Sequence, residues 1–598
     1  MFSKVLIANR GEIAIRVVRA CRELGIPTVA VYSEIDRDAL HVKAADEAYL
    51  LGPAPAAESY LKVERILEIV AQSGAEAVHP GYGFLAENAA FARALEEAGI
   101  VFIGPPASAI EAMGSKTAAR ELMKSAGVPI VPGTTQTVES IDAARAIAKD
   151  DIGYPVAVKA AGGGGGKGFR VALTEDDLQG AFEGASREGE KFFSDPRVYL
   201  ERYLPDPRHV EVQVLADRHG NVIHLGERDC SIQRRHQKLI EESPAPEWIV
   251  DPAMRARIGE IGVDAAKAVG YVGAGTVEGL LQDGEYFFLE MNTRVQVEHC
   301  VTEMTTGVDI VKEGIRAAAG EPLSLSQEQV VLRGHAIECR INAENAAKGF
   351  TPAPGRIGRY KEPSGPGVRV DSGVGEGGEV SPMYDPMVAK LIVWDVDRAS
   401  ATSRMLRALD EFEIEGLTTL IPFHRALLAT DEWARGSTCR ELLEDKAWLK
   451  STAPAAPPEP PEDEGEDASV EQSYTVEVSG RRFEVNVIGP PFGGGASMNG
   501  AAPSASAPRR PKRGDRKSGA GGGPDLLSSP LQGNMWKVLV KQGEAVEEGQ
   551  ILCIIEAMKM ENEITAHKAG VVKELAIVEG AAIAAGDPIA LIVAPPEA

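Results

Sequence analysis

Cysteine is scarce in this chain of 598 residues, and its six residues are widely spaced. No two of them form a CxxC pair, which argues against a zinc site, and their spacing does not suggest a disulfide framework. The pattern fits a reducing compartment. The cysteines are Cys21, Cys230, Cys300, Cys339, Cys439 and Cys553.

Long apolar runs are also missing. No stretch reaches the roughly 18 apolar residues that a membrane span needs, so we expect no association with a membrane. The segment from Lys4 to Ala8 is too short for the core of a signal peptide and predicts a buried strand. We therefore expect a cytoplasmic protein.

Positive charge is in deficit, because 63 Lys and Arg face 88 Asp and Glu and leave a net charge of −25. An acidic surface repels phosphates, so we expect no nucleic-acid partner, although solubility explains the charge equally well. A basic patch from Arg509 to Lys517 lies in a Gly/Ala/Ser/Pro-rich stretch. It therefore indicates a solvated linker rather than a binding site.

The length suggests about four domains. Strand and helix patterns alternate at the start, whereas short apolar runs separated by Gly and acidic residues dominate the end. The predicted parts are an α/β domain over 1–110, a motif-rich domain over 111–320, a mixed domain over 321–447, a flexible linker over 448–523 with a small hairpin near 474–487, and an all-β domain over 524–594.

A glycine-rich loop separates two apolar strands. Val156–Ala160 and Phe169–Val171 flank the run Gly162–Gly166, so a hairpin loop is favoured over a linker. Glycines let backbone N–H groups approach phosphate oxygens, and Lys159 and Lys167 add positive charge. No Ser or Thr follows the lysine, so the loop is not a P-loop. Such a glycine flap over ATP is typical of the ATP-grasp superfamily.

Two carboxylates are expected to meet across a hairpin. Two strands flank an Asp283-Gly284 turn, which brings Glu278 close to Glu290. Paired carboxylates are costly unless a cation neutralises them, and oxygen ligands beside ATP suit Mg²⁺. The alternative to a metal site is that both glutamates are solvated at the surface. The apolar strands around Glu290 make this alternative weaker.

Arg294, Gln296 and Glu298 alternate along what the pattern predicts to be a strand, so their side chains would share one face. Arginine binds small planar oxyanions with two hydrogen bonds, and a neighbouring carboxylate can remove a proton from the bound anion. Bicarbonate fits this set.

Lys559 lies near the middle of the last domain, within Glu556-Ala557-Met558-Lys559-Met560. A two-fold repeated β sandwich would place this midpoint at a hairpin tip, where a lysine amine is open to acylation. The Ala-Met-Lys-Met motif resembles the biotinylation motif of biotin carboxyl carrier domains. Lipoyl domains share the fold but usually show Asp-Lys-Ala. Ser529 to Gly533 also resembles the start of carrier domains in acyl-CoA carboxylases.

Motifs along residues 1 to about 447 resemble those of biotin carboxylases. They are Val5-Leu-Ile-Ala-Asn-Arg-Gly-Glu12, His79-Pro-Gly-Tyr-Gly-Phe-Leu85, Glu201-Arg-Tyr-Leu204, Glu227-Arg-Asp-Cys-Ser231, Gln233-Arg-Arg-His-Gln-Lys238, Glu290-Met-Asn-Thr-Arg294, Glu338-Cys-Arg-Ile-Asn-Ala-Glu344 and Tyr384-Asp-Pro-Met387. With the carrier domain, the chain resembles the fused α-subunit of a bacterial acetyl-/propionyl-CoA carboxylase. The implied fold is multidomain α/β and α+β, namely a biotin carboxylase with an ATP-grasp domain, then a linker and a small all-β, lipoyl-like biotinyl domain.

The resemblance also implies roles for matching positions. ATP contacts would come from Lys116, Lys159, Gly164, Gly165, Gly166, Glu201, Tyr203, Leu204, His209, Gln233, His236, Lys238 and Glu278. Mg²⁺ or Mn²⁺ would be held by Glu278, Glu290 and Asn292. Bicarbonate would be bound by Arg294, Gln296 and Val297, with Glu298 as the base, Arg340 stabilising the biotin enolate, and Tyr82 and Gly83 near biotin. Glu298, Arg340, Lys238 and Arg294 form the implied catalytic set.

The implied reaction begins with ATP-dependent activation of bicarbonate to carboxyphosphate. CO₂ is then released beside biotin, and carboxybiotin on Lys559 moves to a second active site. The long linker suits this movement, because tethering replaces a bimolecular encounter. The implied partners are biotin protein ligase and a carboxyltransferase β-subunit, with a homo-oligomeric core in a larger hetero-oligomer.

Three positions depart from the family pattern. Cys300 stands where Pro is usual, Gly314 where Gln is common, and Thr419 where Asn is usual. None of these changes removes a charged catalytic group, so we expect activity.

Three other interpretations compete. An ATP-grasp ligase of the carbamoyl phosphate synthetase type would not need Lys559. A carrier protein with a degenerate carboxylase region would not need Lys238, Glu298 and Arg340. Pyruvate carboxylases usually place a barrel of about 250 residues before the carrier, whereas only about 75 residues lie between the two blocks here.

Overall fold

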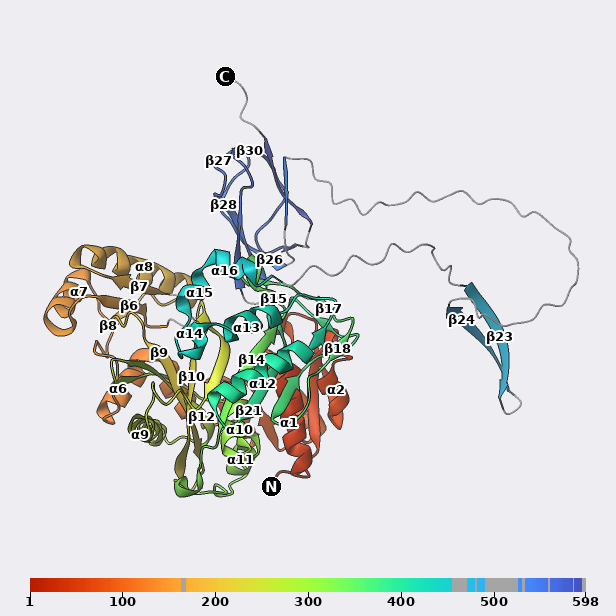
Figure 1. Cartoon of the computed structure of the whole chain (residues 1–598), viewed down its shortest axis with the longest axis horizontal. Coiled ribbons are helices and arrows are strands. Elements are labelled where there is room, and N and C mark those ends of the chain that lie inside the picture. The colour runs from red at the N-terminus through yellow and green to blue at the C-terminus, as the bar shows by residue number, and fades with distance from the viewer. Residues whose placement is uncertain are drawn as a thin grey trace, which may run out of the picture. The chain divides into compact units, whose positions relative to one another are not determined.

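The computed structural model describes most of the chain (Figure 1). The described residues are 1–162, 168–453, 470–478, 481–489, 525–529, 533–557, 560–583 and 586–593. Gly164, Gly165, Gly166 and Lys559 lie outside them. The chain divides into a unit of residues 1–453 with 524–598 and a unit of residues 454–523.

The first domain is built on a parallel sheet. Val5–Ile7 (β1) pairs with both Thr28–Ser33 (β2) and Ala77–His79 (β4), and Gly11–Glu23 (α1) connects β1 to β2. Gly11 has φ +64°, which permits the tight turn into α1. The predicted βαβ pattern is confirmed. The strand order is β3-β2-β1-β4-β5, with β3 Glu47–Gly52, β5 Val101–Phe102, and helices α2 Leu40–Ala44, α3 Val63–Ser73, α4 Ala89–Glu97 and α5 Ala107–Gly114.

A small three-stranded sheet carries the ends of the glycine-rich loop. Val156–Ala160 (β6) pairs antiparallel with Phe169–Ala172 (β7) and with Val198–Arg202 (β8). The predicted hairpin is therefore confirmed on both sides of the loop. The helices of this region are α6 Lys116–Ser125, α7 Ile141–Ile147 and α8 Glu175–Phe193, the last beginning with a capping box from Thr174 and Asp177.

The largest sheet has eight strands, in the order β13-β12-β9-β10-β11-β14-β21-β19. It runs without interruption past residue 320, because strands from both sides of that position pair through β11 and β14. Its strands are β9 Arg208–Ala216, β10 Val222–Arg234, β11 Gln237–Ser243, β12 Gly273–Gln282, β13 Glu285–Asn292, β14 His335–Asn342, β19 Val368–Ser372 and β21 Met387–Asp395. Helices α9 Pro252–Ala268, α10 His299–Thr306 and α11 Ile310–Ala318 accompany it.

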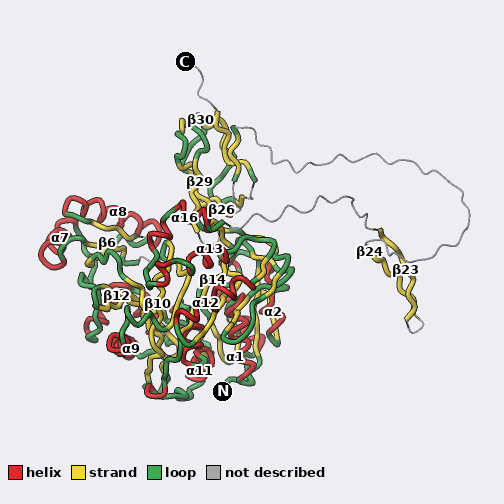
Figure 2. The backbone as a smooth tube through the Cα atoms, viewed as in Figure 1, coloured by secondary structure: helices red, strands yellow, loops and turns green. Residues whose placement is uncertain are grey.

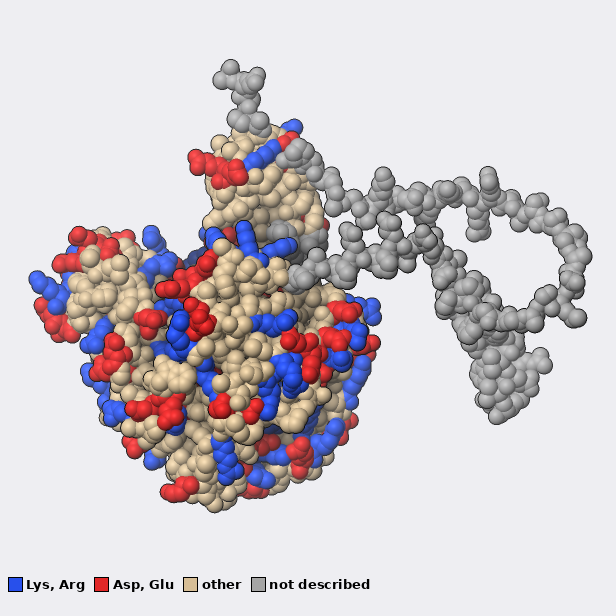
Figure 3. All heavy atoms as spheres, viewed as in Figure 1, with Lys and Arg blue, Asp and Glu red and all other residues tan. Residues whose placement is uncertain are grey.

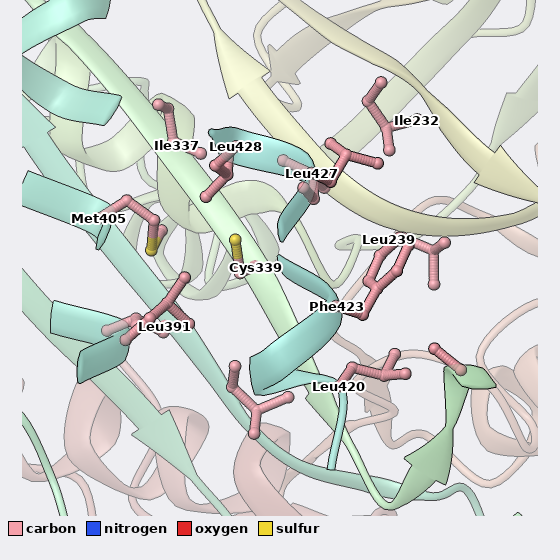
Figure 4. Packing of buried hydrophobic residues seen from close by; sticks show 14 of the residues in the cluster. Ile232, Leu239, Ile337, Cys339, Leu391, Met405, Leu420, Phe423, Leu427 and Leu428 are labelled. Carbon is pink, nitrogen blue, oxygen red and sulfur yellow. The ribbon is translucent and has the colours of Figure 1, made fainter. Parts of the chain in front are cut away.

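Helices that follow β21 in the chain cover one part of the eight-stranded sheet. Arg398–Glu411 (α12) and Ile421–Leu428 (α13) pack near β14 and β21 (Figure 2). Their apolar side chains meet those of the strands, and Figure 4 shows Met405, Phe423 and Leu427 around Cys339 and Leu391. The core thus fixes β14, the strand that carries Arg340. Helices α14 Asp431–Ala434, α15 Arg440–Glu444 and α16 Lys446–Ser451 follow.

The C-terminal domain is an all-β sandwich of two four-stranded sheets. Ile551–Ala557 (β28) and Met560–Thr565 (β29) form a hairpin in which Ala557 pairs with Met560. Only residues 558 and 559 separate the two strands, so the hairpin expected at the midpoint of the domain is confirmed. The other strands are β25 Leu526–Ser528, β26 Gly533–Val538, β27 Ala545–Val546, β30 Gly570–Leu575, β31 Ala582–Ile583 and β32 Pro588–Val593. In the second unit, β23 Val470–Val478 and β24 Arg481–Gly489 form the small hairpin expected near 474–487.

Within the described ranges, no helix combines the length and apolar character needed to cross a membrane. On the face shown in Figure 3, acidic and basic side chains are interspersed over the carboxylate-rich larger unit. On this face, neither sign of charge gathers in a single region.

Helix α11 allows a stability prediction at Gly314, one of the departures from the family pattern. A Cβ added there would meet nothing closer than Ala274, at 3.9 Å. Gly314→Ala should therefore raise the free energy of unfolding by about 0.5–1 kcal/mol, because glycine is a poor helix former. The melting temperature of the domain, measured by calorimetry, checks this.

Gly262 in α9 provides the matched control. A Cβ there would lie 2.4 Å from Val212 Cγ1, so Gly262→Ala should lower the melting temperature by overpacking. If both substitutions shifted the melting temperature in the same direction, the space available for a Cβ would not determine the effect of a Gly→Ala substitution in these two helices.

Candidate active site

Carboxylates face one another across neighbouring strands of the large sheet. Glu278 on β12 pairs in register with Glu290 on β13 and with Glu211 on β9. Asp283 and Gly284 both have positive φ, as the tight turn between β12 and β13 requires. The predicted meeting of Glu278 and Glu290 is confirmed, and Glu211 joins them from the other side.

Lys238 on β11 is the centre of the charge cluster. Its Nζ lies 2.6 Å from Glu211 Oε2, 3.0 Å from Glu278 Oε1 and 2.6 Å from Glu298 Oε1. Burial opposes its charge, but Glu211, Glu278 and Glu298 raise the pKa of Lys238 well above its ordinary value. One cation therefore holds three carboxylates together at a buried position.

Glu298 is shared between two cations. Its Oε1 accepts from Lys238, and its Oε2 lies 3.0 Å from Arg340 Nη2. Burial favours the neutral acid, yet Lys238, Arg340 and Arg228 lower the pKa of Glu298 below its ordinary value. The carboxylate is therefore ionised at neutral pH, as a proton acceptor must be.

The prediction that Arg294, Gln296 and Glu298 lie on one strand face is wrong. β13 ends at Asn292, where its ladder with β12 ends, and the chain continues irregularly until α10 begins at His299. Side-chain hydrogen bonds hold this segment instead of a strand partner. Gln296 donates to Glu278 over 2.7 Å and accepts from Arg228 over 2.6 Å.

The structure nevertheless brings two of the three side chains together. Gln296 and Glu298 both contact the Lys238 cluster, whereas Arg294 turns toward the edge of the site. Its Nε donates to Glu87 over 2.9 Å and its Nη2 donates to Asn292 Oδ1 over 2.7 Å. The Arg294 guanidinium therefore donates to Glu87 and Asn292, and its hydrogen bonds do not go to Glu298.

The described residues expected to contact ATP come from two sheets, from the turns beside their strands and from the start of α6. Lys116 pairs with Glu290 over 2.7 Å, and His209 lies 3.0 Å from Glu278. Lys159 on β6 pairs with Glu201 on β8. Gln233 is near the end of β10, where it donates to the Cys230 carbonyl, and His236 lies in the turn between β10 and β11 with φ +65°. Tyr203 and Leu204 follow directly after β8.

The carboxylates fit a magnesium or manganese site. Glu278, Glu290 and Asn292 offer oxygen atoms at adjacent strand positions, and oxygen is the ligand that Mg²⁺ prefers. Lys116 and Lys238 compensate the negative charge of the two carboxylates. A divalent cation would take over this compensation and leave both lysines for an anionic substrate.

Sequence reasoning missed several charged residues of the cluster. Glu211 is fully buried and contacts both Lys238 and Arg228. Polar residues at 209, 211 and 213 alternate with valines, so a strand with a polar buried face could have been expected there. Glu241, whose Oε1 lies 2.6 Å from Arg340 Nε, gave no such signal.

Comparison with known proteins places this site in a family. Four family models match the chain: biotin carboxylase, N-terminal domain (residues 1–110), carbamoyl-phosphate synthase L chain, ATP binding domain (115–326), biotin carboxylase C-terminal domain (338–445) and biotin-requiring enzyme (524–592). A biotin-dependent acyl-coenzyme A carboxylase alpha3 subunit from Mycobacterium leprae is 46% identical over 595 residues, which cover 99% of this chain and 98% of that protein. The chain belongs to the biotin carboxylases that carry a fused biotinyl domain.

Two further matches each cover about three quarters of this chain. A pyruvate carboxylase subunit from Methanothermobacter thermautotrophicus is 57% identical over 445 residues, which cover 74% of this chain and 90% of that protein. The biotin carboxylase domain dimer of the Hydrogenobacter thermophilus 2-oxoglutarate carboxylase, solved with MgADP, ADP and bicarbonate, is 51% identical with a TM-score of 0.71, and the match covers 75% of this chain and 99% of that one. The chain is thus an ATP-grasp ligase with biotin carboxylase activity, which uses covalent biotin and takes ATP and bicarbonate as substrates.

A pH dependence follows from Glu241. Burial raises the pKa of this biotin carboxylase residue to about 7, with Glu298 also raising it and Arg340 and Lys238 opposing the rise. Since Glu241 takes up a proton as the pH falls through about 7, Arg340 then loses a charged partner. We expect the rate of biotin-dependent ATP cleavage to fall below about pH 7.

Glu241→Gln mimics the protonated acid at every pH. Its rate should be low throughout and should lack the inflection near pH 7 in a profile measured between about pH 6 and 8.5. An unchanged inflection in Glu241→Gln would assign the titration to another group.

Proposed function

We propose that this chain is the α-subunit of an acyl-CoA carboxylase of the acetyl-/propionyl-CoA type. It would carboxylate biotin held on its own Lys559, attached there by biotin protein ligase, and a separate carboxyltransferase β-subunit would complete the transfer. The full-length match to an acyl-coenzyme A carboxylase subunit carries this proposal. The match to the pyruvate carboxylase subunit is higher in identity, but it covers 74% of this chain rather than 99%.

The nucleotide would be bound between the small and large sheets. Glu278, Glu290 and Asn292 would hold Mg²⁺ or Mn²⁺, which shields the charge of the phosphates and polarises the γ-phosphoryl group. Lys116 and Lys238 would exchange their carboxylate partners for phosphate oxygens. Both would then stabilise charge that develops during phosphoryl transfer.

Bicarbonate would lie beside Glu298. The Arg294 guanidinium, the Gln296 amide and the backbone of Val297 would bind its oxygens. Glu298 would take the bicarbonate proton on a carboxylate oxygen that Lys238 or Arg340 now occupies. When these cations turn toward the substrates, the basicity of Glu298 would increase.

Arg340 would act on the acceptor side of the site. Biotin, when bound, supplies a ring nitrogen that accepts the carboxyl group. Tyr82 and Gly83, from the first domain, would position the ring, and Arg340 would stabilise negative charge on its carbonyl oxygen. Arg340 Nη2 lies 3.0 Å from Glu298 Oε2, so the residue that would act on biotin is in direct contact with the residue that would deprotonate bicarbonate.

We also propose the domain boundaries 1–110, 111–320, 321–447, 448–523 and 524–594, with a homo-oligomeric carboxylase core inside a larger complex. The boundary at 320 divides the chain between α11 and β14, although both sides contribute strands to the eight-stranded sheet, and α16 extends past 447 to Ser451. The acceptor can be tested on the complex that co-purifies with the tagged chain from its own cells. Labelled bicarbonate should enter acetyl-CoA or propionyl-CoA in the presence of ATP. Labelling of pyruvate with no labelling of an acyl-CoA would overturn the proposed substrate class.

A further inference from the structure

Lys390 is a fully buried lysine that stands outside the Lys238 charge cluster. It lies on β21, in register with Arg340 on β14 and with Asp371 on β19. Residues in register on antiparallel strands share one face of the sheet, so Lys390 lies on the same face as Arg340. Its Nζ donates to the backbone carbonyl of Val297 over 2.8 Å.

The Val297 carbonyl lies between two residues of the cluster. Gln296 precedes it and contacts Glu278, and Glu298 follows it and contacts Lys238. This segment has no strand partner, because β13 ends at Asn292. A fixed donor on the Val297 carbonyl therefore limits rotation of the backbone that carries both side chains.

A second arm of the same contact network reaches the first domain. Glu12 Oε2 lies 3.3 Å from Lys390 Nζ, and the Tyr82 hydroxyl donates to Glu12 Oε1. Lys390 thus stands between Tyr82 on the biotin side and Val297 on the bicarbonate side. Although burial opposes its charge, Cys300, Glu12, Glu338 and Asp371 raise the pKa of Lys390 well above its ordinary value, and it remains a cation.

Cys300 completes the surroundings of the amine. Its Sγ lies 3.1 Å from Lys390 Nζ and 3.2 Å from Asp371 Oδ2, in the first turn of α10. Cys300, one of the positions expected to depart from the family pattern, therefore places a polarisable group against the lysine. The buried charge is matched on several sides, which fixes its position.

We propose that Lys390 is a positioning residue: it holds the Val297 carbonyl and thereby fixes the conformation of the bicarbonate-binding segment from Gln296 to Glu298. It also links that segment through Glu12 to Tyr82. The inference rests on the proposed function of this segment. It predicts a selective loss of bicarbonate binding when the amine is removed, since Lys390 contacts Val297, Cys300, Glu12 and Asp371, and no described residue assigned to ATP is among them.

Two variants of the full-length chain separate this role from folding. Lys390→Met combined with Glu12→Gln removes the amine without leaving Glu12 charged, and Lys390→Arg keeps the charge with a different reach. ADP formation with free biotin gives the KM for bicarbonate and for ATP. We expect the bicarbonate KM to rise about 10- to 100-fold in the double variant, because that is the effect of losing a hydrogen bond to a charged group. The bicarbonate KM should change less in Lys390→Arg. The ATP KM should stay close to that of the unmodified chain.

Lys361→Met is the matched control, because Lys361 is an exposed lysine paired with Glu413 at the surface. It should leave both KM values unchanged. A bicarbonate KM within about twofold of the unmodified value in the double variant would overturn the proposal, as would an equal rise in the ATP KM or failure of both variants to fold. Absence of bicarbonate-dependent ADP formation in the unmodified chain would instead refute the proposed function itself.

Discussion

Lys559→Arg is expected to reduce acyl-CoA carboxylation to background while free biotin is still carboxylated. Arginine keeps the positive charge but remains protonated and cannot be acylated by the ligase, so the chain loses its tethered acceptor. The charge cluster around Lys238 lies on other strands and is untouched. The two rates, measured on one preparation with the carboxyltransferase present, separate the carrier step from biotin carboxylation.

Lys573→Arg provides the matched control in the same domain, since Lys573 is an exposed residue of β30. It should behave as the unmodified chain does. Survival of coupled turnover in Lys559→Arg would show that another residue carries biotin.

Glu298→Gln is expected to lower biotin- and bicarbonate-dependent phosphate release by about 10²- to 10⁴-fold, the usual contribution of a general base. Glutamine preserves the volume and can still accept a hydrogen bond from Lys238, which contacts Glu298 over 2.6 Å. The loss should therefore appear in kcat more than in the KM for ATP. Steady-state phosphate release at saturating ATP measures it.

Glu285→Gln, an exposed position at the start of β13, controls for the removal of one negative charge from this region. A melting temperature close to that of the unmodified chain would show that Glu298→Gln folds. Near-normal phosphate release by a folded Glu298→Gln variant would remove Glu298 from the role of base.

Much of the architecture could be predicted from the sequence because the signals are local. The alternating pattern from Val5 to Ser33 gave the parallel strands β1 and β2, and the Asp283-Gly284 turn placed Glu278 opposite Glu290. The same holds for the hairpin between β28 and β29, in which Ala557 and Met560, the outer residues of the motif that resembles a biotinylation site, pair with each other. Each feature depends on residues close together in the chain.

The rest depends on contacts that no local pattern encodes. Arg294, Gln296 and Glu298 have the spacing of a strand, yet the ladder ends at Asn292 and tertiary hydrogen bonds take over. Lys390 lies 93 residues from the Val297 carbonyl that it contacts. Such buried ion pairs form between distant strands, so their residues look like ordinary charged positions in the sequence.

The departure at Cys300 is accommodated without disturbing the cluster. α10 begins at His299, and the thiol faces Lys390 and Asp371 rather than Glu298. Glu298 keeps both of its cations beside this substitution. The geometry therefore supports the expectation that activity is retained.

The central claim is that this chain carboxylates a biotin carried on its own Lys559. Its most direct test is to incubate the biotinylated full-length chain with ATP, Mg²⁺ and labelled bicarbonate, without a carboxyltransferase, and to locate the label by peptide mapping. Our account predicts ATP-dependent label on the biotinyl peptide that contains Lys559, and none in Lys559→Arg. A biotinylated Lys559 that stays unlabelled while ATP is cleaved would contradict it.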